Sequence, residues 1–217
     1  MFANRTALEE ELETRRIGRL CHFTQLANVA GILREGAIYS RSSAESRRIE
    51  VHWNDPARFD NLRGFVCCSI QYPNPFLLDK FRKEDQTIDW AIFLLDPILI
   101  TGLNVRFSPM NAAKATSRKE KGVRAFKGLY AKEVGGRPRG EQHHRACPTD
   151  LQAEVLVPDK ILLGSVKALM VADDRSRTLV EESIERSRHE KVGFDVVVEP
   201  RLFDKGRVIG SVLGDGK

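Results

Sequence analysis

Short apolar runs separated by polar segments dominate this chain, and they predict many short strands with few helices between them. Strands are expected at residues 19–23, 37–40, 65–70, 91–95, 98–101, 152–157 and 195–198. Helical spacing of apolar residues predicts helices at 6–17, 24–36, 111–127 and 175–190, whereas residues 161–172 fit either type. This pattern favours an α+β fold with a mixed or antiparallel central sheet and peripheral helices over a doubly wound parallel sheet.

Two polar segments interrupt the regular pattern, at 41–64 and 133–150. The first offers little periodicity and the second is rich in glycine and charge, so both are expected to be functional loops. No internal repeat or linker divides the 217 residues, which are expected to form one domain over 1–217.

The composition is that of a soluble globular protein, with 41% hydrophobic and 30% charged residues. No apolar run approaches the roughly 20 residues of a membrane span, and the acidic amino terminus is unlike a signal peptide, so we expect a cytoplasmic protein without membrane association. The four cysteines lack paired spacing, which disfavours disulfides and zinc; no metal is expected.

A net charge of +5 is compatible with an anionic partner such as nucleic acid or a dinucleotide, or with an ordinary solvated surface. Neither a G-x-G-x-x-G turn after a strand nor a G-x-x-x-x-G-K-[ST] loop is present. The sequence therefore disfavours both a dinucleotide fold and a P-loop enzyme.

Three segments carry candidate chemistry. His22 and Thr24 lie where a predicted strand meets a helix, a junction that suits an amide or ribose edge and a nearby anion; alternatively, Thr24 caps the helix and His22 is structural. Arg58 precedes a buried strand and could hold a pyrophosphate, or form a surface pair with Asp60. Glu154 interrupts an apolar strand, where a carboxylate is costly unless it is paired or lies at a site mouth; alternatively, it lies on an exposed strand face. It is the best catalytic candidate.

In their order and spacing, these segments resemble the DarT family of DNA ADP-ribosyltransferase toxins over residues 19–172. The likeness rests on H-F-T…N-x-x-G-I-L…G at 22–36, R-x-D at 58–60, C-C-S-I followed by P-N up to 74, F-S-P-M-N-A-A at 107–113 and Q-A-E-V-L-V at 152–157. The R-x-D…S-I-x-x-P-N wording is closer to the guanine-modifying branch of the family than to the thymine-modifying one.

The resemblance implies an ADP-ribosyltransferase-like fold that splits NAD⁺ as co-substrate and attaches ADP-ribose to a base of single-stranded DNA. It assigns the NAD⁺ contacts to His22, Phe23, Thr24, Asn28, Gly31 and Arg58. Glu154 and Arg58 match the family's catalytic glutamate and arginine, although Arg63 and the pair Arg47 and Arg48 are alternatives for the arginine. Asn111 falls near the target base, and a macrodomain antitoxin is the implied partner.

The basic loop before Glu154 is where DNA recognition is expected if this likeness holds. Its candidate phosphate contacts are Arg137, Arg139, His143, His144 and Arg145, with base stacking on Phe126 or Tyr130. Two other functions fit the sequence: an ADP-ribosyltransferase that modifies RNA or protein, and a catalytically silent nucleic-acid-binding module.

Overall fold

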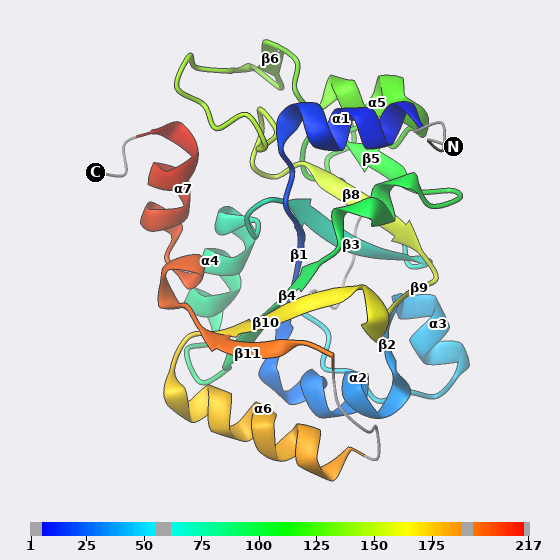
Figure 1. The fold of residues 1–217 in the computed structure, drawn as a ribbon, viewed down its shortest axis with the longest axis vertical. Coiled ribbons are helices and arrows are strands. Elements are labelled where there is room, and N and C mark those ends of the chain that lie inside the picture. The colour runs from blue at the N-terminus through cyan, green and yellow to red at the C-terminus, as the bar shows by residue number, and fades with distance from the viewer. Residues whose placement is uncertain (1–5, 55–61, 188–192, 215–217) are drawn as a thin grey trace, which may run out of the picture.

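A computed structural model of the chain describes residues 6–54, 62–187 and 193–214. Its centre is a seven-stranded sheet in the order β11-β10-β4-β1-β3-β8-β5 (Figure 1). The strands are β1 (Leu20–Gln25), β3 (Phe65–Ile70), β4 (Trp90–Leu95), β5 (Arg106–Ser108), β8 (Glu154–Pro158), β10 (Val166–Val171) and β11 (Asp195–Val198). Neighbouring strands are antiparallel except β10 and β11, which are parallel. The predicted α+β fold with a mixed sheet is confirmed.

Helices and shorter strands surround this sheet. The helices are α1 (Ala7–Arg15), α2 (Val29–Glu35), α3 (Arg41–Ser46), α4 (Pro75–Glu84), α5 (Gly122–Gly128), α6 (Asp174–Arg186) and α7 (Lys205–Leu213). Short 3₁₀ turns cover Leu26–Asn28, Pro97–Thr101, Leu163–Ser165 and Pro200–Phe203. Two small antiparallel pairs join β2 (Ala37–Tyr39) to β9 (Lys160–Leu162), and β6 (Glu133–Val134) to β7 (Arg137–Pro138).

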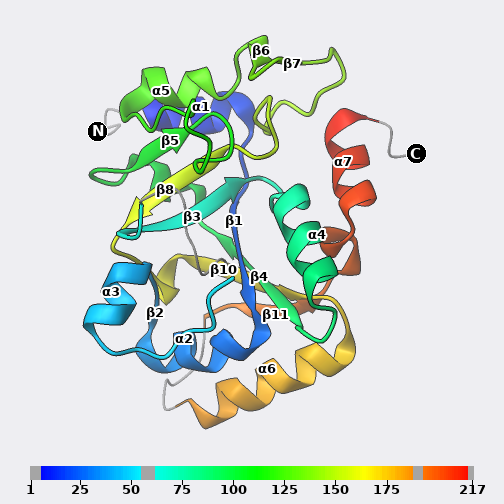
Figure 2. The same ribbon diagram turned by 180° about the vertical axis from the view of Figure 1, so that it is seen from behind.

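Strand β4 is buried on both faces, and its alternating side chains divide the core in two. Ala91, Phe93 and Leu95 belong to one cluster, which includes residues of α1, α2, α5 and α6. Trp90, Ile92 and Leu94 belong to the other, which lies against α4 and the Pro200–Phe203 turn. Helices α4 and α7 lie side by side on that second face (Figures 1 and 2). Because both faces of β4 are covered, its run of apolar residues is continuous rather than alternating.

Two predicted elements are wrong. Residues 98–101 form a 3₁₀ turn instead of a strand, because Pro97 occupies its first position and Asp96 accepts the Ile98 N–H at 2.9 Å. The helix expected at 111–127 covers only Gly122–Gly128. Glu120 forms an isolated bridge with Phe107 of β5, and this pairing draws the preceding segment to the sheet edge.

Other boundaries also differ from the prediction. Thr24 lies inside β1 rather than capping a helix, and α2 begins after a 3₁₀ turn. The polar segment 41–64 contains helix α3, and residues 161–172 contain the end of β9, a turn and β10. Helices α4 and α7 were not expected; Asn74 caps α4 by accepting the N–H groups of Phe76 and Leu77, both at 3.1 Å. Within the described residues, every helix is too short or too polar to cross a bilayer.

Candidate active site

Strand β1 separates from β3 after its first two residues, and this separation creates the site. On one side, all six residues of β1 pair with β4. On the other side, β1 pairs with β3 only at Leu20 with Ile70 and at Cys21 with Ser69. From His22 onward the two strands diverge, and Nδ1 of His22 lies 2.9 Å from the Cys67 carbonyl oxygen across the gap. A carbonyl oxygen only accepts, so Nδ1 donates and Nε2 of the neutral ring is an acceptor.

Glu154 is the first residue of β8, which lies next to β3 in the sheet. Its register partner on β5 is Ser108, and its Oε1 accepts the Ala112 N–H at 2.9 Å. This bond ties the 107–113 segment to the carboxylate. The neighbouring Asn111 accepts the Ala113 N–H at 2.8 Å through Oδ1. Two sequence motifs that are about 45 residues apart are therefore adjacent in space, because β5 and β8 pair at this point.

His22 and Glu154 line one cavity of about 230 Å³ at this separation. Several other sequence-predicted residues share its wall: Phe23, Thr24, Asn28, Gly31 and Asn111. The NAD⁺-binding candidate His22 and the catalytic candidate Glu154 come from opposite sides of the gap, one on β1 and one on β8. Arg58 lies outside the described residues. The cavity thus unites residues from distant parts of the chain, since about 130 residues separate His22 from Glu154.

Asn28 holds the segment 49–54 along the cavity. Its Nδ2 donates to the Thr24 hydroxyl and to the His52 carbonyl oxygen, both at 2.9 Å, and its Oδ1 accepts the His52 N–H at 2.8 Å. The Asn28 side chain is buried. Both amide protons are therefore committed to protein partners, and Asn28 positions His52 and the adjacent Trp53 along the cavity.

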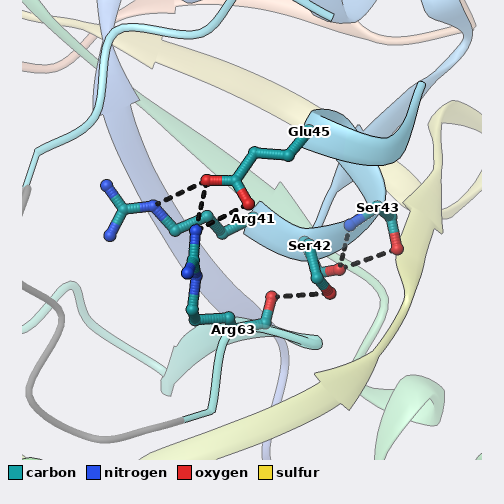
Figure 3. Close-up of polar contacts among 6 residues, drawn as sticks. Arg41, Ser42, Ser43, Glu45 and Arg63 are labelled. Atoms are coloured by element: carbon teal, nitrogen blue, oxygen red, sulfur yellow. Dashed lines mark hydrogen bonds and ion pairs between the residues drawn. The ribbon is translucent and has the colours of Figure 1, made fainter. Parts of the chain in front are cut away.

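Arg41 is a cavity residue that the sequence analysis missed. It is the first residue of α3, its side chain is only 8% exposed, and its guanidinium carbon lies 4.7 Å from the centre of the Trp53 ring. Glu45 forms an ion pair with Arg41, whose Nε lies 3.7 Å from Oε1, and accepts hydrogen bonds from Arg63 at 2.5 and 2.6 Å (Figure 3). A buried guanidinium in a cavity is suited to an anion. Little in the sequence pointed to this residue, because Arg41 opens a segment without periodicity.

The alternative arginines have other surroundings. Arg63 is half-exposed and paired with Glu45, while its carbonyl oxygen accepts from the Ser42 hydroxyl at 3.2 Å (Figure 3) and from the Ser42 N–H at 2.9 Å. Arg47 lies over the Tyr39 ring at 5.0 Å, and Arg48 adopts a left-handed backbone conformation with φ of 59°. Among the described residues, none of these three lines the cavity.

The residues of the basic loop at 133–150 divide into two groups. Arg139 donates to the carbonyl oxygens of Cys147 at 2.8 Å and His144 at 3.1 Å, and buried His143 bonds the Pro148 carbonyl oxygen at 2.9 Å. These two side chains hold the loop together. The others are exposed: Arg137, His144 and Arg145. Arg137 also pairs with buried Asp150 at 3.4 Å, and Nδ1 of His144 accepts the Ala146 N–H at 3.2 Å.

Phe126 and Tyr130 do not provide the stacking surface that was expected. Phe126 is fully buried against Phe107, and Tyr130 is 8% exposed with its hydroxyl donating to the Ala146 carbonyl oxygen at 3.1 Å. Both aromatic rings stabilise the core under α1 and α5. The expectation failed because proximity to a basic loop in the sequence does not distinguish a buried ring from an exposed one.

The cysteine thiols near the site are poor nucleophiles. Burial raises the pKa of Cys21 to about 12, and it also raises the pKa of Cys68, to which the nearby Glu154 charge contributes. All four cysteines are free of disulfides. Because a thiolate is the reactive form, these buried thiols are chemically quiet at neutral pH.

Solved structures of similar fold include DarT proteins. Thermosipho africanus DarTG in complex with ADP-ribose is 17% identical with a TM-score of 0.61, covering 86% of this chain and 51% of that one, so this chain spans about half its length. The structure of Thermus sp. 2.9 DarT in complex with carba-NAD⁺ is 14% identical with a TM-score of 0.60, covering 85% of this chain and 96% of that one. The same protein in complex with ADP-ribosylated ssDNA is 13% identical with a TM-score of 0.59, covering 86% of this chain and 96% of that one. No curated protein matches the chain.

At these low identities the structural likeness establishes only the fold. A sequence model of the family provides separate evidence for membership. The model described as ssDNA thymidine ADP-ribosyltransferase, DarT, matches residues 21–203. That span contains both walls of the cavity, from His22 on β1 to Glu154 on β8, and it covers most of the 217 residues. The chain therefore belongs to the DarT family of NAD-dependent ssDNA ADP-ribosyltransferases.

Proposed function

We propose that this chain transfers ADP-ribose from NAD⁺ to a base of single-stranded DNA and releases nicotinamide. One observation carries the proposal: His22 and Glu154 line the same cavity, which opens where β1 and β3 separate. An imidazole and a carboxylate on facing walls are what a reaction at a ribose needs. The Thermus sp. 2.9 DarT complexes with carba-NAD⁺ and ADP-ribosylated ssDNA support the same substrates for this site.

The reaction breaks the bond between the ribose C1′ and the nicotinamide nitrogen, and the leaving nicotinamide keeps the electron pair. The sugar then resembles the oxocarbenium ion of glycoside hydrolysis. The Glu154 carboxylate stabilises this positive charge and hydrogen-bonds the ribose. A nitrogen of the target base forms the new bond to C1′, and the proton that it loses is taken up by Glu154. The Ala112 N–H fixes the carboxylate at 2.9 Å, so it is oriented before substrate binds.

His22 and Arg41 supply the binding contacts in this proposal. The bond from Nδ1 of His22 to the Cys67 carbonyl oxygen fixes the ring in the cavity wall, where it contacts the nicotinamide amide or a ribose hydroxyl. Arg41 is a buried cation for the pyrophosphate, and the Trp53 ring and Glu45 hold it in place. By resemblance, Arg58 serves the same anion and orients the ribose.

The DNA side of the site is proposed to run from Asn111 toward the basic loop. Asn111 lines the cavity and is followed by Ala112, whose N–H binds the Glu154 carboxylate. In this proposal the target base enters the cavity beside Asn111. Arg137, His144 and Arg145 are exposed and suited to phosphates, whereas Arg139 and His143 act by holding the loop. A single-stranded substrate is expected because a base stacked in a duplex cannot enter such a cavity.

Guanine is the acceptor base that we propose, on the R-x-D…S-I-x-x-P-N wording at 58–74. The matching family model is described by thymidine, so the choice is open to a direct test. Oligonucleotides that each contain one base type are incubated with NAD⁺ and analysed by mass spectrometry. An ADP-ribose adduct on the guanine oligonucleotide supports the proposal, and an adduct on thymine alone contradicts it.

Nicotinamide release separates this function from its alternatives. We expect release to depend on both active protein and single-stranded DNA. Release that requires RNA or a protein acceptor instead would indicate the second enzymatic function. Tight, salt-dependent oligonucleotide binding without any release would indicate a silent binding module.

A macrodomain protein that removes ADP-ribose is proposed as the antitoxin partner. This proposal rests on the family resemblance and on the name DarTG of the Thermosipho africanus protein. Coexpression of such a partner is expected to relieve any growth inhibition that this chain causes, and the Glu154→Gln variant should need no partner.

A further inference from the structure

A second cavity, of about 630 Å³, lies on the face of the sheet that carries α4 and α7. Its wall combines the start of β1, the turn after β3, strands β10 and β11, and one side of α7. The polar residues that line it are Arg19, Tyr72, Glu199, Arg201, Arg207 and Ser211. None of the residues assigned to the NAD⁺ reaction above lies among its described lining residues.

The charge of this cavity is positive. Glu199 binds Arg201 through two bonds, at 2.8 and 2.7 Å, so these two charges compensate each other. Arg19 and Arg207 are two further guanidinium groups, and the described lining contains no other carboxylate. Arg207 is exposed, and Arg19 is half-buried with its Nε donating to the Gln71 carbonyl oxygen at 2.7 Å. Three guanidinium groups against one carboxylate in a single cavity favour an anionic ligand.

An aromatic ring accompanies these cations. The guanidinium carbon of Arg19 lies 5.4 Å from the centre of the Tyr72 ring, and the His144 ring meets the same tyrosine edge-on at 6.4 Å. Gln71 fixes the position of Tyr72, since it adopts a left-handed conformation with φ of 69° and its Oε1 accepts the Gly18 N–H at 3.1 Å. A half-buried aromatic ring beside arginines is the combination by which proteins bind nucleotides of single strands.

Helix α7 leaves room on this side. Gly206 and Gly210 both line the cavity, four residues apart and therefore on one face of the helix. Glycine within a helix costs about 1 kcal/mol of stability relative to alanine. The two glycines carry no side chain, so this face of α7 leaves space in the cavity.

The second cavity adjoins the first through the segment 72–77. Tyr72 lines the second cavity and Asn74 the first, and their Cα atoms are at most about 7 Å apart because they are two residues apart. The same segment carries Phe76, whose ring centre is 5.3 Å from the Arg137 guanidinium carbon and 5.1 Å from the Lys205 ammonium nitrogen. Each of these cations also has a carboxylate partner, Asp150 for Arg137 at 3.4 Å and Asp79 for Lys205 at 3.5 Å. Phe76 and its two cations therefore lie on the segment that joins the two cavities.

We propose that this second cavity binds a nucleotide of the single-stranded DNA substrate outside the target base, with a backbone phosphate at Arg19 and Arg207 and a base against Tyr72. The inference rests on the proposed function, which supplies the DNA strand. It assigns the strand a path from the cavity of Glu154, past Phe76 and Arg137, to α7. It also gives Tyr72 the stacking role for which Phe126 and Tyr130 are too deeply buried.

Oligonucleotide length provides the test. Transfer by the full chain is measured on a trinucleotide and on an oligonucleotide of about twelve nucleotides that carry the same accepted base. In Arg207→Glu, the ratio of kcat/KM for the long substrate to that for the short one is expected to fall about tenfold. The slope of log kcat/KM against log salt concentration for the long substrate should become shallower by about 0.7 for each phosphate that the variant no longer neutralises.

Two further variants control this experiment. Tyr72→Ala should lower the same ratio about tenfold without changing the salt slope, because it removes stacking and no charge. Arg186→Glu is the matched control, since Arg186 is a 77% exposed arginine on α6 that pairs with Glu182. It should leave the ratio and the slope at their wild-type values.

The outcomes separate this inference from the proposed function. If Arg207→Glu and Tyr72→Ala change both substrates equally, or change neither, the nucleotide site is refuted while the transferase function stands. If a free mononucleotide competes with the trinucleotide as well as with the long oligonucleotide, the second cavity is not a DNA subsite. If the wild-type chain modifies neither substrate, the proposed function fails first, and the inference that depends on it fails with it.

Discussion

Exchange of the Glu154 carboxylate for the amide of glutamine isolates the charge on which the reaction depends. Oε1 accepts the Ala112 N–H at 2.9 Å, and the carbonyl oxygen of glutamine can accept the same bond. The 107–113 segment should therefore stay in place. The variant lacks the negative charge beside the ribose and the group that takes up the proton. A preorganised group of this kind contributes about 3–4 kcal/mol to the transition state, so transfer should fall roughly 10²- to 10³-fold.

Glu154→Ala should show the same catalytic loss together with a structural one. It removes the only acceptor described for the Ala112 N–H, and Ala112 is fully buried. An unpaired buried N–H costs about 1–3 kcal/mol. For a chain of this length, 1 kcal/mol corresponds to about 2–4 °C, so Tm should fall by roughly 2–12 °C. Glu154→Gln should keep Tm within about 2 °C of the wild-type value.

The assay combines nicotinamide release in the presence of single-stranded DNA with thermal unfolding of each variant. Glu120→Gln is the control, because Glu120 lies near the same sheet edge but its side chain is 58% exposed. Its ion pair is a long one, with 4.0 Å between its carboxylate and the Arg118 guanidinium. It should retain wild-type release. Release by folded Glu154→Gln at the wild-type rate would refute the assignment of this carboxylate to catalysis.

Three further predictions concern the surroundings of the site. Asn28→Ala frees the His52 backbone, so we expect a higher KM for NAD⁺ and a loss of about 1–3 kcal/mol in unfolding free energy, measured with urea; an unchanged KM would contradict the positioning role. Arg41→Lys should raise the KM for NAD⁺ about tenfold with little change in Tm, because lysine keeps the charge but lacks the planar fork; equal KM values would exclude Arg41 from phosphate binding. Burial, and then the Arg139 charge, lower the pKa of His143 below 6.5, so the unfolded chain takes up a proton first and stability falls as pH drops below about 6.5. His143→Gln should lessen that fall in urea unfolding at pH 7.5 and 5.5, and an identical pH dependence would disprove it.

The strands that carry the site could be predicted because each is a short apolar run with a polar interruption. The run at 19–23 predicted β1, and the run at 152–157 predicted β8, which begins at Glu154 in the structure. Burial selects for such runs locally, so they can be recognised without knowledge of their neighbours. The strands β3, β4 and β11 were found in the same way.

Helix boundaries and side-chain environments were predicted less well. Thr24 has the chemistry of a helix cap, but the pairing of β1 with β4 extends through Gln25 and keeps it in the strand. Phe126 and Tyr130 precede the basic loop and were expected to stack on bases, yet the Phe107 ring and α1 cover them. In both cases a contact with a distant segment overrides the local preference.

The sequence by itself determined which chemical groups are present for the reaction. These are the His22 imidazole in one predicted strand, the Glu154 carboxylate in another, and the basic loop that precedes Glu154. Only the tertiary structure decided which of them meet, since the divergence of β1 from β3 brings His22 and Glu154 to one cavity and places buried Arg41 beside it. The reason is that local sequence governs burial and backbone preference. The meeting of side chains from β1, α3 and β8 depends instead on strand order and on where two neighbouring strands stop pairing.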